Sequence, residues 1–387
     1  MKSFPKHRRL PAILLALAAA GLGAAEAVVA TCGPFTDTAA DAFCPFVLEI
    51  FYLGITTGTT PTTYSPADNV TRLQMAAFLS RTVDGTLKRR GKRAALRQYW
   101  TTQNSTVLGL TTVAQSPRFV RYDGADLWVS CSNGISRVRA SDGRPLETWT
   151  GAPNAAGVLT AIGKVLIAGG GNPGSLYVID PSQPAGAATT VASNLGNVAI
   201  GIAFDGTRVF TANTSGSVSL VTPGASIPWT VTTVSSGFIT PTGAVFDGSN
   251  VWITDSDAGT LLKLDPSGTV LQTVTVGSNP NFPVFDGTSL WVPNATGSTV
   301  SVVRASNGAV LATLTGNGLA LPRAAAFDGQ RVLVTDSGSD AVSLWKAADL
   351  TPLSTIPTGA STSVYAAASD GVSFWITLSN VNKLARF

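Results

Sequence analysis

A ten-residue stretch that recurs along the chain constrains the fold more than any other feature of the sequence. Its clearest copy runs from Phe246 to Asp255 and combines the end of one apolar strand, an Asp-Gly pair and a second apolar strand. Short strands repeated about every 40 residues are typical of a radial array of four-stranded blades, so the sequence predicts a β-propeller. Six further copies follow the same pattern, one of them only weakly. The turn glycines of the seven copies are 39 to 43 residues apart, at Gly124, Gly163, Gly206, Gly248, Gly287, Gly329 and Gly371.

Each repeat also carries one large apolar residue soon after its turn. An Asp-Gly pair between apolar runs predicts a tight hairpin, because glycine accepts a positive φ and aspartate bonds the nearby backbone. Large apolar side chains at one phase of every repeat are what packing between blades requires. We interpret them as a packing column and not as a binding site. The column contains Trp128, Leu166, Phe210, Trp252, Trp291, Leu333 and Trp375.

The two ends of this region predict how the ring closes. Three strands of the last repeat come from residues 362–369, 372–378 and 380–387, and residues 105–112 supply the missing outer strand. A blade shared in this way leaves no unpaired closing edge. We therefore expect an all-β, seven-bladed propeller over residues 99–387. Its repeats resemble those of YVTN/NHL-like propellers, a resemblance that implies the fold but says little about the ligand.

Residues 1–30 have the composition of a secretory signal peptide. A basic start is followed by an apolar run from Pro11 to Ala24 and by small residues suited to cleavage. The apolar run is too short and too rich in alanine to span a bilayer stably. The mature protein is therefore expected to be secreted and to have no transmembrane segment. Lipidation at Cys32 and a twin-arginine signal at Arg8-Arg9 are the alternatives.

Residues 31–84 predict a small α-helical module in front of the propeller. Pro45 suits the first turn of one helix, and a second helix begins at Thr71 with the capping box Thr71–Gln74. The segment Phe35-Thr36-Asp37, the Gly-Ile-Thr-Thr-Gly loop at 54–58 and the stretch 64–76 occur in a characteristic order and spacing. In these segments the module resembles an S-layer homology (SLH) motif.

The SLH resemblance implies that the module attaches an exported bacterial protein to an anionic secondary cell-wall polymer. In the family, the arginine of a Thr-Arg dipeptide lines the glycan groove, and this role falls here on Arg72, next to Thr71. The chain departs from the family by having Leu73-Gln74 in place of Ala-Glu, and by showing one copy where three commonly build the groove. On the alternative interpretation, Thr71 and Gln74 only cap a helix and Arg72 is solvated.

The three cysteines and a basic segment complete this part of the sequence. Cys32 and Cys44 flank the start of the module, and export permits a disulfide between them. Cys131, in a predicted strand, is expected to be a free and buried thiol. Residues 85–98 form a basic linker, which either is a plain spacer or touches wall polymer or lipid headgroups.

The composition of the propeller excludes several classes of function. From residue 99 onward, 14 Lys and Arg stand against 16 Asp and Glu, so nothing there indicates nucleic-acid binding. The one histidine, His7, lies in the predicted signal peptide, which excludes histidine-based catalysis and metal binding, including that of streptogramin-lyase-like propellers. Glu147 is the one glutamate of this domain, and no residue set matches the metal site of sugar-lactonase propellers. No cofactor or metal is expected.

Two weaker patterns concern ligands of the propeller. The turns 255–257 and 336–340 are rich in oxygen and could hold calcium, although ordinary Asx turns have the same composition. Five residues before each turn aspartate, at one mouth of the channel, Arg118, Arg323 and Tyr365 fall in neighbouring blades. Two arginines around a tyrosine predict a site for an anionic ligand, with simple solvation as the alternative.

The sequence therefore favours a non-enzymatic protein of the bacterial cell wall or cell envelope. Its propeller would act as a scaffold or recognition module for an unknown protein or glycan partner. The alternative is a propeller enzyme, a lyase or a lactonase, with an Asp/Arg site in the channel. The lack of histidine and the scarcity of glutamate in residues 99–387 argue against this alternative.

Overall fold

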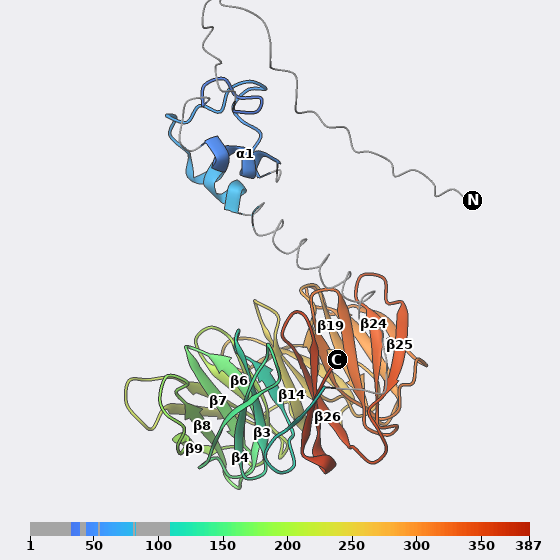
Figure 1. Ribbon diagram of the computed structural model, residues 1–387. Helices are drawn as coiled ribbons and strands as arrows, with labels where there is room; N and C mark the ends of the chain where they lie inside the picture. Colours follow the sequence, from blue (N-terminus) through green and yellow to red (C-terminus); the bar gives the residue numbers. More distant parts are fainter. Residues whose placement is uncertain (1–31, 39–43, 53–54, 80–81, 83–108) are drawn as a thin grey trace, which may run out of the picture. The chain divides into compact units, whose positions relative to one another are not determined.

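The computed structural model describes residues 32–38, 44–52, 55–79, 82 and 109–387 (Figure 1). The chain divides into two units, residues 1–93 and 94–387. The predicted signal peptide and basic linker lie outside the described residues, as do residues 105–108 of the predicted closing strand.

A disulfide ties the start of the first unit to its first helix. The helix α1 spans Cys44–Tyr52, and residues 72–79 form a second helical segment that begins after Thr71, as predicted. The predicted bridge between Cys32 and Cys44 is present, with 5.7 Å between the two Cα atoms. The amide of Ile55 bonds to the carbonyl of Ile50 at 2.9 Å, so the chain turns back on itself where α1 ends.

The second unit is the predicted seven-bladed β-propeller. It consists of seven four-stranded antiparallel sheets. The strands β2, β6, β10, β14, β18, β22 and β26 contact one another in this order, and β26 contacts β2. These strands therefore form a closed inner ring around a central channel, and the other strands of each blade follow outward.

The strands are assigned to the blades in chain order. Blade 1 contains β2 (Val120–Tyr122), β3 (Asp126–Cys131), β4 (Gly134–Arg139) and β5 (Pro145–Trp149), and blade 2 contains β6 (Ala155–Ala161), β7 (Lys164–Gly169), β8 (Gly174–Ile179) and β9 (Thr189–Leu195). Blade 3 contains β10 (Ala199–Phe204), β11 (Val209–Asn213), β12 (Ser217–Thr222) and β13 (Thr230–Val234), and blade 4 contains β14 (Pro241–Phe246), β15 (Val251–Asp255), β16 (Thr260–Leu264) and β17 (Val270–Thr275). Blade 5 contains β18 (Val284–Phe285), β19 (Ser289–Asn294), β20 (Thr299–Arg304) and β21 (Val310–Leu314), and blade 6 contains β22 (Pro322–Phe327), β23 (Arg331–Asp336), β24 (Ala341–Lys346) and β25 (Pro352–Pro357). Blade 7 contains β26 (Val364–Ser369), β27 (Phe374–Leu378), β28 (Lys383–Arg386) and β1 (Gly109–Thr112).

Blade 7 is shared between the two ends of the propeller, which confirms the predicted closure. β1 pairs antiparallel with β28, from Gly109 opposite Arg386 to Thr112 opposite Lys383. Beside this pairing, the hydroxyl of Thr377 donates a hydrogen bond of 2.7 Å to the carbonyl of Arg118. The ring is therefore closed both by strand pairing within blade 7 and by a direct bond from blade 7 to blade 1.

The predicted strand at 380–387 is shorter than expected, and a turn takes its place at the start. Ser379–Val381 form a 3-10 turn, and Asn382 adopts a left-handed conformation with φ 56°. The side chain of Asn382 accepts a hydrogen bond of 2.8 Å from the amide of Ser116. The extended conformation therefore begins only at Lys383. The residues before it form a turn, and this turn bonds to the segment that leads from β1 into blade 1.

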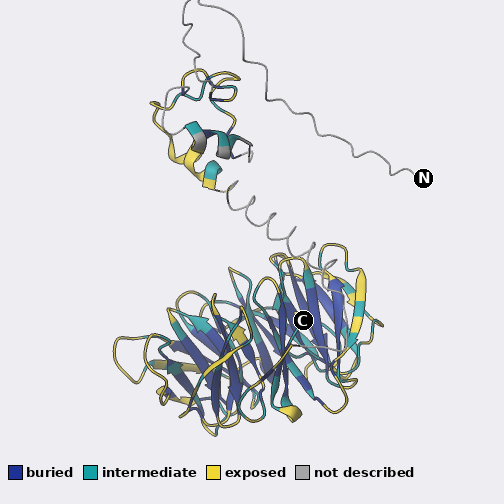
Figure 2. Ribbon diagram, viewed as in Figure 1, coloured by how far each residue is buried: buried dark blue, intermediate teal, exposed yellow. Residues whose placement is uncertain are grey.

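The turn aspartates connect each hairpin to the packing column. One carboxylate oxygen of Asp247 accepts the amides of Ser249 and Asn250, and the other accepts the indole Nε1 of Trp252 at 2.7 Å. All seven residues of the predicted packing column are fully buried, which confirms their assignment. Figure 2 shows this buried interior, with exposed residues on loops and on outer strands such as β25. The same tryptophan-to-aspartate bond occurs in the pairs Asp123–Trp128, Asp286–Trp291 and Asp370–Trp375.

Candidate functional site

The segment Phe35-Thr36-Asp37 organises the loop before the second helical segment. The Asp37 carboxylate accepts the amides of Tyr64 at 2.9 Å and Ser65 at 2.7 Å, and the bond from Tyr64 is the main reason that the pKa of this carboxyl is lowered. Phe35 is fully buried, with its ring centroid 5.1 Å from that of Phe51 and 5.5 Å from that of Tyr64. These residues of the SLH-like pattern therefore fix the fold of the module.

The predicted capping box lies at the start of the second helical segment. The Gln74 amide donates to the Thr71 hydroxyl at 3.2 Å, and the Thr71 amide donates to Gln74 Oε1 at 2.8 Å. The hydroxyl of Thr71 is therefore used by the helix cap. Arg72 is exposed and forms no ion pair or side-chain hydrogen bond with the residues that the structure describes. Its guanidinium is free to reach a glycan, and equally free to be solvated.

The structure brings two of the three residues predicted at the channel mouth together. The guanidinium of Arg323 lies 3.8 Å from the ring centroid of Tyr365, a stacked cation–π contact. The Nε of Arg323 is buried and has no hydrogen-bond partner in the described part of the chain. Arg118 is exposed, and its side chain forms no ion pair, hydrogen bond or ring contact with this pair. Of the two arginines predicted to surround Tyr365, Arg323 contacts it and Arg118 does not.

Two phenylalanines that the sequence did not single out complete this mouth. The rings of Phe119 and Phe282, from blades 1 and 5, meet edge to face at 4.7 Å, and Phe119 also meets Tyr365 at 5.3 Å. Blades 1 and 5 are not neighbours in the ring, so this contact crosses the channel. The mouth is therefore an aromatic plug that blocks one end of the channel, with Arg323 stacked on it.

Beyond the plug, the central channel contains a cavity of about 540 Å³. Its walls come from the innermost strands of all seven blades and are largely apolar or aromatic. Arg121 of β2 is the one charged residue among the described residues that line it. The lining contains no carboxylate, so an Asp/Arg pair of the kind expected for an enzyme is not formed there by described residues.

The oxygen-rich turns considered for calcium bind the backbone of the protein itself. The carboxylate of Asp255 accepts the amides of Ile239 at 2.7 Å and Thr240 at 2.8 Å. Asp340 accepts the amide of Ser361 at 2.7 Å in the same manner. Among the described residues, no cluster of three or more His, Cys, Asp and Glu side chains could hold a metal ion. These carboxylates thus hold backbone amides 15 to 21 residues away and fasten neighbouring loops, which differs from the local bond of an Asx turn.

Asp336 differs from the other buried aspartates of the ring. It is fully buried, accepts the hydroxyl of Ser343, and receives a backbone amide only at 3.4 Å, from Ala320. Burial raises the pKa of this carboxyl to about 7. The corresponding residues at the ends of β11 and β19 are Asn213 and Asn294.

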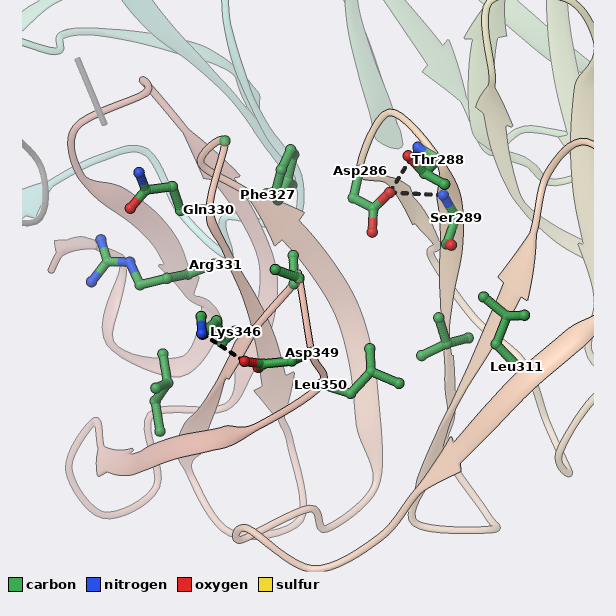
Figure 3. Close-up of a pocket in the computed structure, with 15 residues that line it drawn as sticks. Asp286, Thr288, Ser289, Leu311, Phe327, Gln330, Arg331, Lys346, Asp349 and Leu350 are labelled. Atoms are coloured by element: carbon green, nitrogen blue, oxygen red, sulfur yellow. Dashed lines mark hydrogen bonds and ion pairs between the residues drawn. The ribbon is translucent and has the colours of Figure 1, made fainter. Parts of the chain in front are cut away.

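A second cavity, of about 900 Å³, lies between blades 5 and 6 (Figure 3). Its charged groups are already paired within the described chain: Lys346 contacts Asp349 at 2.6 Å, and Asp286 bonds its own turn. Arg331 likewise contacts Asp328 at 2.7 Å. The remaining walls are mostly apolar, so this cavity has no free charge with which to select a ligand.

Comparison with known proteins finds a similarity for each part of the chain. Residues 34–76 match the family model of the S-layer homology domain. The propeller is similar in structure to virginiamycin B lyase from Staphylococcus aureus, with a TM-score of 0.62 and 14% identity over 72% of this chain and 98% of the lyase chain. It is also similar to Kuenenia stuttgartiensis hydrazine synthase, with a TM-score of 0.61 and 14% identity over 74% and 98% of the two chains. The WD40 propeller of Doa1 gives a TM-score of 0.58 and 14% identity over 73% and 97%.

At this level of identity, the similarity to solved structures shows the propeller fold alone. No curated protein sequence matches the chain. No helix in the described part of the chain is long and apolar enough to cross a membrane. An S-layer homology domain followed by a seven-bladed propeller is thus the organisation of this protein.

Proposed function

We propose that this chain is a bacterial cell-envelope protein whose S-layer homology domain binds a secondary cell-wall polymer and displays the propeller. The match of residues 34–76 to that domain carries the proposal. Arg72 lies within the matched segment, is exposed, and has no charge partner among the described residues. An exposed guanidinium at the start of a helix suits hydrogen bonding to an anionic glycan.

The propeller acts in this proposal as a non-enzymatic recognition or scaffold module. The chain has one histidine, at position 7, and the described lining of the central cavity contains no carboxylate. General acid–base catalysis in a channel needs such groups within reach of a substrate. A rigid ring with paired turn charges is better suited to presenting a surface or holding a ligand than to proton transfer.

The wall-binding role can be tested by co-sedimentation of the full-length protein with purified bacterial sacculi. We expect Arg72→Ala to weaken binding about tenfold, the effect of losing one charge-assisted hydrogen bond to an anion. Lys88→Ala, which removes one of several interchangeable charges in the basic segment, serves as the matched control and should change binding little. Equal losses from both variants, or equal binding to sacculi stripped of their secondary polymer, would contradict specific recognition.

A lyase activity is the second candidate, because the propeller is similar in structure to virginiamycin B lyase. A variant of that enzyme with a histidine replaced by alanine is catalytically inactive and was crystallised with quinupristin. Residues 99–387 of this chain contain no histidine, so we expect no such activity. Incubation with quinupristin, followed by liquid chromatography, tests this directly, and loss of the substrate peak would favour the enzyme.

A further inference from the structure

One arginine interrupts an otherwise apolar position of the inner ring. In each blade, one residue of the innermost strand pairs across the sheet with the packing-column residue, and all seven of these partners line the central cavity. A residue needed only for packing would be apolar in every blade, but blade 1 has arginine here. The seven residues are Arg121, Leu159, Ala203, Val245, Val284, Ala326 and Ala368.

The charge of Arg121 has no partner in the described part of the protein. Its side chain is open to the water of the channel, and no ion pair or hydrogen bond to it is formed by the described residues. Some arginines of the ring are neutralised, as Arg137 is by Asp126 at 2.8 Å and Glu147 at 3.1 Å. Arg323, by contrast, has no ion pair among the described residues but stacks on Tyr365, whereas no ring of the described chain stacks on Arg121. The protein around Arg121 desolvates the guanidinium and lowers its pKa, yet arginine remains charged. An unpaired cation between the walls of a channel attracts an anion that enters it.

The neighbouring position of the inner strands supplies aromatic walls. The residue that follows the Arg121 position along the inner strand is phenylalanine in four blades and tyrosine in a fifth. These five residues also line the cavity. They are half-buried and line the channel from five of the seven blades, and Phe327 also lines the cavity between blades 5 and 6. Mainly apolar side chains with a few polar groups, of which Arg121 is the charged one here, are typical of small-molecule sites, whose usual volumes of about 300–1,000 Å³ include this cavity. The five aromatic residues are Tyr122, Phe204, Phe246, Phe285 and Phe327.

The aromatic plug determines from which end a ligand can enter. Phe119 and Phe282 meet across the channel at 4.7 Å, at the start of the inner strands. Arg121 and the five aromatic residues lie toward the other end of these strands, next to the Asp-Gly turns. The cavity is therefore closed at its base and accessible from the turn side of the ring.

We propose that the central channel binds a small organic anion, with its acidic group on Arg121 and its apolar body against the ring of aromatic side chains. The anion is a carboxylate, sulfonate or phosphate attached to a flat or aromatic body, because a purely inorganic ion would leave the apolar walls unused. This site is separate from the wall anchor and does not depend on it.

The test uses two fluorescent probes that differ in one charged group. Anilinonaphthalene sulfonate has an aromatic body with one sulfonate, and N-phenylnaphthylamine has nearly the same body without it. At low salt, the full-length protein should bind the sulfonate at one site about tenfold more tightly than the neutral probe, as one charge-assisted hydrogen bond allows. Arg121→Val should abolish this preference by lowering the affinity for the sulfonate and leaving that for the neutral probe unchanged.

The controls distinguish the channel from other surfaces. Valine is the residue found at this position in blades 4 and 5, so Arg121→Val should fold, and Arg121→Lys should retain most of the preference because it keeps the charge. Arg139→Ala removes a half-exposed arginine that pairs with Asp142 and does not line the cavity, and it should change neither affinity. The proposal is overturned if wild-type protein binds neither probe, if Arg121→Val keeps the preference, or if Arg139→Ala weakens it equally. Binding to sacculi should not respond to Arg121→Val, so the two proposals fail separately.

Discussion

Replacing Asp336 by asparagine should stabilise the propeller, and the gain should depend on pH. Asp336 is fully buried beside Ser343, without the short backbone hydrogen bonds that Asp255 receives at the same position of blade 4. Asparagine already occupies this position in two blades. There, Asn213 donates to Ser219 and Asn294 donates to Ser301, each at 3.0 Å. The replacement thus reproduces a polar pair that the ring already contains, without the buried charge.

The expected magnitude follows from the pKa of the buried carboxyl. Burial raises it from 3.8 to about 7, and at about 1.36 kcal/mol per pKa unit this corresponds to about 4 kcal/mol. Because the folded-state pKa is the higher one, the wild-type contribution is fully present below pH 4 and is lost as the pH rises through 7. Asp336→Asn does not titrate, so its stability relative to wild type should be near zero at pH 4 and rise toward about 4 kcal/mol at pH 8.

Urea unfolding at several pH values, followed by tryptophan fluorescence, measures this difference. All 8 tryptophans lie at or after Trp100, so the signal reports on the propeller and not on the SLH domain. Asp255→Asn is the matched control. It replaces a carboxylate that accepts two short amide bonds and should destabilise the ring by about 1–3 kcal/mol at neutral pH. A difference between Asp336→Asn and wild type that stays flat from pH 4 to 8 would refute the reasoning.

Two further predictions concern the thiols and the ring closure. In the native, unreduced protein, no cysteine should react quickly with iodoacetamide, because Cys32 and Cys44 are bridged and burial raises the pKa of Cys131 to about 11. Denaturation should release one reactive thiol and reduction three, whereas three thiols without reduction would disprove the bridge. Deletion of residues 109–112 should lower the melting temperature or cause aggregation, because β28 then loses its partner and several ladder hydrogen bonds of about 1 kcal/mol each. Unchanged melting of a monomeric deletion variant would mean that β1 contributes little to closure.

The ring itself was predictable because its main determinants are local. A tight hairpin needs a residue that accepts a positive φ. Each repeat has a glycine at this point, so the positions of the glycines give the positions of the blades. Gly248 has φ 93° and Asp247 accepts two amides of its own turn, as the Asp-Gly pattern implied. The bond from Trp252 to Asp247 was not anticipated, although the five-residue spacing between Asp and Trp recurs in four repeats. The spacing was the signal that could have revealed it.

The channel could not be predicted in the same way, because its contacts join residues from distant blades. Counting back from the turns identified Arg118, Arg323 and Tyr365, but five of the seven inner strands carry an irregularity near their start, as between Pro322 and Ala325. Such a bulge changes which residues face the axis. Phe119 and Phe282 meet only when the ring has closed, and no periodicity within either repeat indicates their contact.

When the blades are aligned by their strand pairing, each position can be compared across all seven blades. A residue that differs in kind from its counterparts is then a candidate for a functional residue. Arg121 stands where the six other blades have apolar residues, and Asp336 stands where blades 3 and 5 have asparagine, although blade 4 has Asp255 there. Asp336 is sealed from solvent and bonded to Ser343, so it cannot meet a ligand, and its charge only reduces stability. Arg121 is open to the channel and has no partner among the described residues, so its charge is available to a ligand. Access to solvent thus decides which departure from the repeat is a defect in packing and which is a binding site.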